Sequence, residues 1–446
     1  MNRGIRARLA LVVAVLAGLA VMTGLYAEDE RQSGTTTVRP KSLSENVNHG
    51  LAYLISQQDS SGGWGQGGGW RTGSRGRVEG ANVADPPDVG NTCIATLALF
   101  RAGNTPGQGQ YAKNVARAVD FICKHVADAD TSSIYVTNVR DTQLQTKIGP
   151  FVDTFLASLV LAEIKGKMPD ATGEQRLVAA LDKSIGKIQK HQKEDGSFDG
   201  NNAWAPVFSQ GLASKALNRA KQNGVNVDGL ALARAENNAI ASLDVAGGGF
   251  KPAGIGRGAG SGAVLGIATR GGAGGVYAAM SGDAGVRLYS ASNQTAAIQQ
   301  AANTNKEQER LAHEILAKKD APKEERDKAQ ATLDRVAKVE EARKAAVKAV
   351  VSQLGDQRFI QGFGSNGGEE FLSYLNIGET LVFKGGEEWS KWDKSMTDNL
   401  NLIQNQDGSW SGNHCITGRT FCTAAALLVL MADRTPIPIA AKIRTR

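Results

Sequence analysis

The stretch Gln404-Asn405-Gln406-Asp407-Gly408-Ser409-Trp410 decides the fold of this chain. An amphipathic pattern, with apolar residues three and four positions apart, precedes it, and a nearly uniformly apolar stretch at 420–431 follows it. Helices that are apolar on every side are buried ones. The stretch therefore predicts a solvent-facing helix, a tight glycine turn and a buried helix in succession.

The combination of a helix-ending Gln, a glycine turn and an aromatic residue recurs along the chain. Glycine makes up 53 of the 446 residues, and many of its positions belong to this context. The aromatic residues at 198 and 250 are 52 residues apart, and those at 363 and 410 are 47 apart. Such a period is typical of stacked supersecondary units. The residues expected to build the three clearest turns are Gln58 and Trp64, Gln192 and Phe198, and Gln404 and Trp410.

Two segments interrupt this repeat. Residues 303–354 are charged and helical in pattern, with a break at Ala321-Pro322, which predicts an inserted helical hairpin. Either the hairpin is a projecting arm with solvated charges, or it binds a protein partner. Residues 247–285 contain 15 glycines among 39 positions and have no assigned role. Allowing for both segments, the chain contains about six helix pairs.

The Gln–Asp–Gly–Ser–Trp turns resemble the QW repeats of squalene–hopene cyclase-type terpene cyclases. The Thr-Ala-Ala-Ala-Leu-Leu stretch at 423–428 is similar to the inner-helix motif of prenyltransferase and squalene oxidase repeats. The resemblance covers most of 44–434 and implies an all-α fold. It implies an α/α toroid at 43–434, in which about six helix pairs form a ring around a central cavity. A repeat of this kind indicates the fold, whereas function depends on the residues of a site.

The first 27 residues indicate an exported, bacterial protein. Arg3, Arg6 and Arg8 precede an apolar run that ends at Ala27, before an acidic cluster. Cleavage would leave a periplasmic or secreted chain with a linker at 28–42 and a C-terminal tail at 435–446. An uncleaved segment would instead anchor the chain in a membrane. Without these residues the net charge falls from +7 to +4, and no dense basic block suggests nucleic-acid binding.

Three carboxylates are candidates for catalysis because they stand at or near the starts of expected inner helices. These are Asp88, Asp153 and Glu370. A pair of them facing the cavity would suit glycoside hydrolysis. Helix capping is the favoured alternative, since acidic residues stabilise helix N-termini. The Asp-x-Asp-Asp acid of the cyclases is missing from the sequence; Asp128-Ala129-Asp130-Thr131 is the nearest match.

The four cysteines, Cys93, Cys123, Cys415 and Cys422, are candidates for disulfides because an even number in an exported chain favours pairing. In the ring that the resemblance implies, the first and last repeats are neighbours. A Cys93–Cys422 pair, or a nearby combination, would then close the ring. His414 with Cys415 and Cys422 is an alternative set of Zn²⁺ ligands that would need a fourth ligand. No other cofactor is expected.

These features favour a non-catalytic binding or scaffold toroid whose central cavity holds an apolar, isoprenoid or peptide ligand. One alternative is a terpenoid cyclase- or prenyltransferase-type enzyme whose catalytic residues differ from those of the family. Another is a carbohydrate-active enzyme that uses a carboxylate pair. The scarcity of aromatic residues, 6% of the chain, argues against carbocation chemistry.

Overall fold

The computed structural model is almost entirely helical, so the expected all-α class is confirmed. It describes residues 38–436 apart from 73–75, 81–82, 84, 245–248, 252–283 and 364–365. The expected signal peptide, most of the linker, most of the glycine-rich stretch and most of the C-terminal tail lie outside these residues. Within the described part of the chain, no helix is both long and apolar enough to cross a membrane.

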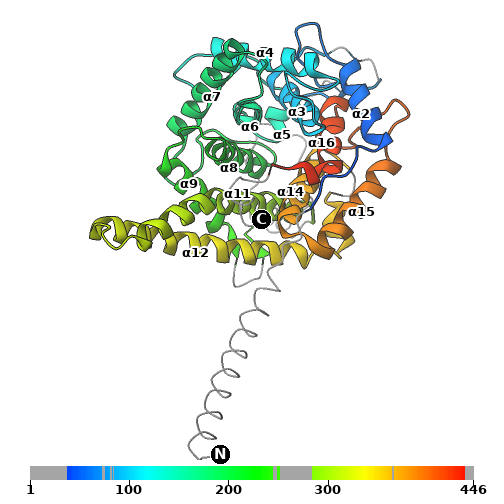
Figure 1. Ribbon diagram of the computed structural model, residues 1–446. Helices are drawn as coiled ribbons and strands as arrows, with labels where there is room; N and C mark the ends of the chain where they lie inside the picture. The colour runs from blue at the N-terminus through cyan, green and yellow to red at the C-terminus, as the bar shows by residue number, and fades with distance from the viewer. Residues whose placement is uncertain are drawn as a thin grey trace, which may run out of the picture.

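Six helices contact one another in an order that closes on itself (Figure 1). α3 contacts α6, α6 contacts α8, and the order continues through α11, α14 and α16 back to α3. These ring helices are α3 (Val89–Arg101), α6 (Val152–Ile164), α8 (Pro206–Gln222), α11 (Ala284–Ala317), α14 (Gly368–Lys384) and α16 (Arg419–Leu430). Their composition explains the position: α6 and α16, for example, are almost entirely apolar and buried.

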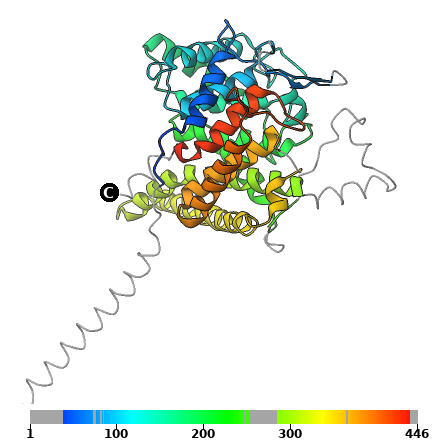
Figure 2. The same ribbon diagram turned by 90° about the vertical axis from the view of Figure 1, so that its right-hand side faces the viewer.

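A second set of helices packs outside the ring helices and alternates with them along the chain. Figure 2 shows two of these, α2 and α15, beside α16. They are amphipathic, so each buries one face and leaves the other in solvent. The outer helices are α2 (Glu45–Ser56), α4 (Ala112–Asp128), α7 (Ala171–His191), α9 (Gly229–Ala241), α12 (Lys323–Val351) and α15 (Gly386–Leu402).

The hairpin forms as expected, but its first arm is not separate from the repeat. α11 runs without interruption for 34 residues, about 50 Å, from the ring into the arm. No Pro or Gly follows Gly285 in this helix, so nothing ends it at residue 303. The chain turns back near Pro322, where the sequence predicted the break, and α12 returns along α11 (Figure 1). The expected insertion is therefore an extension of a ring helix together with its outer partner.

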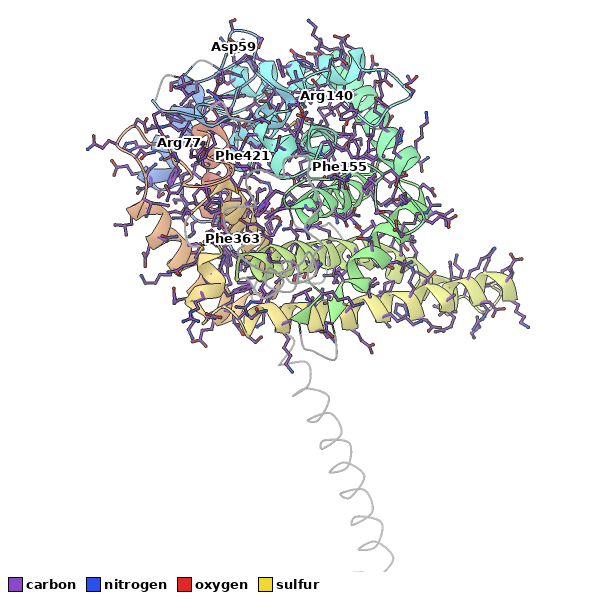
Figure 3. The ribbon with its side chains drawn as sticks, turned by 180° about the vertical axis from the view of Figure 1, so that it is seen from behind. Asp59, Arg77, Arg140, Phe155, Phe363 and Phe421 are labelled. Carbon is purple, nitrogen blue, oxygen red and sulfur yellow. The ribbon has the colours of Figure 1, made fainter. Side chains whose placement is uncertain are left out.

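Short elements complete the described structure. The helical ones are α5 (Gln143–Lys147), α13 (Gln357–Gln361) and the 3-10 helix η1 (Ala432–Arg434). Two small antiparallel ribbons pair β1 (Gly69–Trp70) with β2 (Arg77–Val78), and β3 (Leu243–Asp244) with β4 (Gly249–Phe250). Figure 3 shows Phe155 and Phe421 of the ring helices inside the body, whereas Asp59, in a turn, lies at its edge.

Each complete turn of the repeat fastens an outer helix to the ring helix that follows it. The Trp410 indole Nε1 donates to Leu400 O at the end of α15 (2.8 Å), and the Trp410 amide donates to Thr423 Oγ1 of α16 (2.9 Å). The Trp410 side chain is fully buried. The first turn makes the same two bonds with Trp64, Leu54 and Thr92.

The Gln of the turn connects neighbouring helix pairs. Gln404 Nε2 donates to Gly408 O within the turn (2.8 Å) and to Asn46 O at the start of α2 (2.9 Å). Asn46 Nδ2 in turn donates to Gln404 Oε1 (2.6 Å). Since α2 is the first outer helix and α15 the last, this amide pair closes the chain of helix pairs. Gln58, Gly62 and Asn114 repeat the arrangement between the first and second pairs.

The glycine of the turn is required by both its conformation and its surroundings. Gly408 has φ +84, and a Cβ there would lie 2.6 Å from His49 O of the next outer helix. Only glycine combines this φ with such a close backbone approach. Gly62 and Gly196 occupy the same position against Arg117 O and Arg234 O.

The third turn lacks one partner of the Gln–Asn amide pair that the first and last turns form. Counting three residues back from His49, Arg117 and Arg234 gives Asn46, Asn114 and, in the third case, an alanine at 231. Gln192 therefore has no Asn opposite it. Its Oε1 is buried and has no hydrogen-bond partner within the described residues.

The Gln404 amide pair yields a stability prediction. We expect Gln404→Ala to lower the free energy of unfolding by about 1–3 kcal/mol, because it leaves the partly buried Nδ2 and O atoms of Asn46 without their partners. Urea denaturation of the full chain measures this. Gln406→Ala, at an exposed position of the same turn, is the matched control and should change stability by less than about 0.5 kcal/mol. Equal effects of the two substitutions would contradict the role of the amide pair.

Candidate functional site

The N-terminal ends of several ring helices lie together at one end of the ring, and buried acids gather there. Asp88 is the N-cap of α3, where its Oδ1 accepts from Asn91 N (2.8 Å). Asp153, in the first turn of α6, accepts from Gly90 N of α3 (2.8 Å) and from Gln145 Nε2 (2.7 Å). Both aspartates thus act as helix caps, Asp153 for its neighbour. Burial and the charge of Asp153 raise the pKa of Asp88 to about 7.

Glu370, the third carboxylate candidate, lies in a different environment. It is fully buried in the first turn of α14, and its Oε2 accepts from Gly367 N (3.0 Å). Tyr289 of α11 donates its hydroxyl to Glu370 Oε1 (2.7 Å). His414 Nε2 lies 3.1 Å from Glu370 Oε2. Glu370 is therefore an acid that also orients an imidazole.

His414 and Cys415 lie in the loop before α16 and are both partly exposed. Burial lowers the pKa of His414, but its hydrogen bonds to Cys415 and Glu370 outweigh this and raise it to about 11. Burial and the nearby Glu369 raise the pKa of the Cys415 thiol, against the lowering effect of His414 and Lys147. Cys415, His414, Glu370, Glu369 and Tyr289 are called the Cys415 cluster below.

Glu369 is the member of the Cys415 cluster that has no complete set of partners. Its Oε2 accepts from Ile416 N (3.2 Å), while its buried Oε1 has no partner within the described residues. Burial and the charge of Glu370 raise the pKa of Glu369 to about 7, although His414 lowers it. Glu369 therefore changes charge near neutral pH.

A row of aromatic rings borders the Cys415 cluster. The Phe363 ring centroid lies 5.3 Å from that of Tyr289, 6.3 Å from that of His414 and 6.1 Å from that of Trp204. Lys147 Nζ lies 5.7 Å from the Trp204 ring. Trp204, Phe363 and Lys147 are partly exposed, so an apolar surface and a cation adjoin the thiol.

The other ends of the ring helices hold a second buried group of charges. Arg101 at the end of α3 forms two hydrogen bonds with Glu163 of α6, at 2.9 and 2.7 Å. Lys215 of α8 pairs with Glu379 of α14, and Arg219 Nε lies 3.3 Å from Glu163 Oε1. Burial would raise the pKa of Glu379, but Lys215 and Arg101 lower it to about 2. These ion pairs join four ring helices.

The four cysteines are free thiols in the structure, so it records none of the expected disulfides. Cys422, expected either to pair with Cys93 or to bind Zn²⁺, donates its thiol to Ile416 O (3.4 Å). Cys93 and Cys123 are buried. Among the described residues, no group of three or more His, Cys, Asp and Glu side chains is arranged to hold a metal ion.

A pocket of about 270 Å³ lies between the ring helices α8 and α11 and the outer helix α9. Its lining contains no charged side chain. Five amide side chains give it hydrogen-bonding capacity: Asn201, Gln210, Asn238, Asn293 and Gln294. The Gln294 Oε1 atom is buried and has no partner within the described part of the chain. An uncharged group that donates a hydrogen bond would complete this pocket.

A scan against protein-family models matches none, and no curated protein matches the chain.

The raised pKa of Glu369 predicts how stability depends on pH. The pKa of Glu369 is near 7 in the folded state and 4.5 in the unfolded state. Protonated Glu369 therefore stabilises the fold fully below pH 4.5, and this stabilisation is lost as the pH rises through about 7. We expect Glu369→Gln to reduce this loss between pH 5 and 8 by roughly 3 kcal/mol. Urea denaturation across this pH range measures it. A Glu369→Gln profile parallel to wild type would contradict the prediction.

Proposed function

We propose that this chain is an exported α/α toroid that binds a peptide-like or apolar ligand in the pocket between α8, α9 and α11. The closed contact order of the ring helices and the repeated Gln–Gly–aromatic turns support the toroid assignment. The resemblance to prenyltransferase-like repeats and the 27 N-terminal residues support the rest of the assignment. The α11–α12 arm is a second candidate surface, for a protein partner.

The ligand proposal depends on the state of the Gln294 Oε1 atom. It is a buried acceptor without a partner among the described residues, and the pocket around it is lined by uncharged polar and apolar side chains. A charged ligand would lose its hydration there without gaining a counter-charge. A peptide N–H would instead satisfy Gln294, and an apolar side chain would fill the space between Phe198, Val207 and Ala297.

The size of the pocket limits the ligand. Ordinary ligand pockets enclose about 300–1,000 Å³, and this one encloses about 270 Å³. It therefore accommodates a short segment, with the remainder of a longer ligand outside. The existing bonds of Gln210 to Gly196 O and of Asn293 to Tyr289 O hold two of the amides in place for this role.

Binding of uncharged dipeptides, acetylated at one end and amidated at the other, tests the proposal. We expect Gln294→Leu to weaken their affinity about tenfold, since one hydrogen bond is worth about 1.4 kcal/mol. Isothermal titration calorimetry on the full chain measures this, and Gln330→Leu on the exposed face of α12 is the control. Equal affinity of Gln294→Leu and wild type would contradict the assignment.

Native mass spectrometry of the purified full chain separates the alternatives. A co-purified peptide agrees with the proposal. A co-purified isoprenoid that the protein converts would favour the cyclase or prenyltransferase alternative, and a bound sugar would favour the carbohydrate-active one.

A further inference from the structure

Cys415 is held in a backbone conformation that residues with side chains rarely adopt. Its φ is +55, and Asp141 is the other non-glycine residue with positive φ in the described part of the chain. Gln143 Nε2 donates to Cys415 O (2.8 Å), and the next amide, Ile416 N, donates to Glu369 (3.2 Å). Such strain costs about 1–3 kcal/mol and persists where the surroundings impose it. The structure thus fixes where the Cys415 backbone presents its thiol.

The partners of Cys415 form a thiol–imidazole–carboxylate series. The thiol belongs to the residue directly after His414, and its interaction with the imidazole raises the pKa of His414. His414 is held by Glu370, and Glu370 is held by the Tyr289 hydroxyl and by Gly367 N. A nucleophile beside a proton carrier that a third group orients is the arrangement that nucleophilic catalysis requires.

Access separates Cys415 from the other three cysteines. Cys93, Cys123 and Cys422 are buried, whereas Cys415 is partly exposed. Phe363 and Trp204 beside it offer an apolar surface, and Lys147 offers a positive charge that acts on the thiol. An acyl group with an apolar chain fits this surface, because its chain can lie on the rings and its carbonyl oxygen can face the cation.

We propose that Cys415 is the nucleophile of an acyl-transfer site, with His414 carrying the proton, Glu370 positioning His414, and an ester with an apolar acyl group as substrate. This activity is independent of the peptide pocket between α8, α9 and α11.

The steps balance without a further reactant other than water. The Cys415 sulfur forms a bond to the ester carbonyl carbon, and the carbon–oxygen bond to the alcohol breaks. His414 is protonated at neutral pH because its pKa is raised, so it gives its proton to the alcohol oxygen, and the proton that leaves the thiol replaces it on the imidazole. Water then attacks the thioester, which releases the carboxylic acid and returns a proton to the sulfur. The net reaction is the hydrolysis of one ester.

Acylation by p-nitrophenyl octanoate tests the proposal on the full chain. We expect an initial burst of one nitrophenolate per chain, followed by slower steady release, and peptide mapping of chains quenched during the burst to place the octanoyl group on Cys415. Cys415→Gly should abolish this acylation without loss of stability, since glycine adopts φ +55 without strain. Cys123→Ala, which removes another thiol, should leave acylation unchanged. Labelling of Cys123 or Cys422 at the rate of Cys415 would overturn the proposal.

The roles of the two supporting residues need separate readouts. We expect His414→Gly to slow acylation about 100-fold and added imidazole to restore part of the rate, because imidazole can replace the missing proton carrier. Glu370→Gln should slow acylation while leaving its dependence on ester concentration unchanged. Unaltered acylation in His414→Gly would overturn the role of His414. The role would also be overturned if the variant unfolds at the wild-type urea concentration but imidazole does not restore its lost acylation.

Discussion

The contact between the turn glycine and the backbone of the next outer helix is the constraint on which the rest of the structure depends. At Gly62, Gly196 and Gly408 the approach leaves no space for a Cβ. This closeness places the Gln side chain within reach of the neighbouring helix start, where an Asn is present in two of the three cases. Each turn therefore sets the position of the following helix pair, and the last turn, through Gln404 and Asn46, sets the position of the first.

The common direction of the ring helices accounts for where the ionisable groups lie. Helix N-termini carry partial positive charge and C-termini partial negative charge. The buried acids Asp88, Asp153, Glu369 and Glu370 lie at the first end, and Arg101, Lys215 and Arg219 lie toward the second together with two glutamates. Burial shifts pKa values at both ends, and at the first end these shifts occur beside the partly exposed side chains of His414 and Cys415. The candidate reactive groups therefore lie at the N-terminal end of the ring helices.

The candidate site was predictable only in part. His414 and Cys415 were candidates as metal ligands, and Glu370 as one carboxylate of a pair, for unrelated reasons. The structure brings these three together, while Asp88 and Asp153 serve as caps. Glu369 shared with Glu370 its place at an expected inner-helix start, whereas Tyr289 carried no signal that distinguishes it from helix-forming residues. Gln294 and the amide pocket likewise look in sequence like a polar stretch of a long helix, and only the packing of α8 and α9 against it encloses them.

The sequence by itself determined the all-α class and the positions of the turns, because the Gln, Gly and aromatic residues of one turn act on each other within seven positions. It also located the chain reversal near Pro322, for which a local break in the helix is sufficient. Only the tertiary structure decided that the first hairpin arm continues a ring helix and that His414, Cys415 and Glu370 meet. Those contacts join segments that are far apart along the chain, and their geometry depends on how all six ring helices pack against one another.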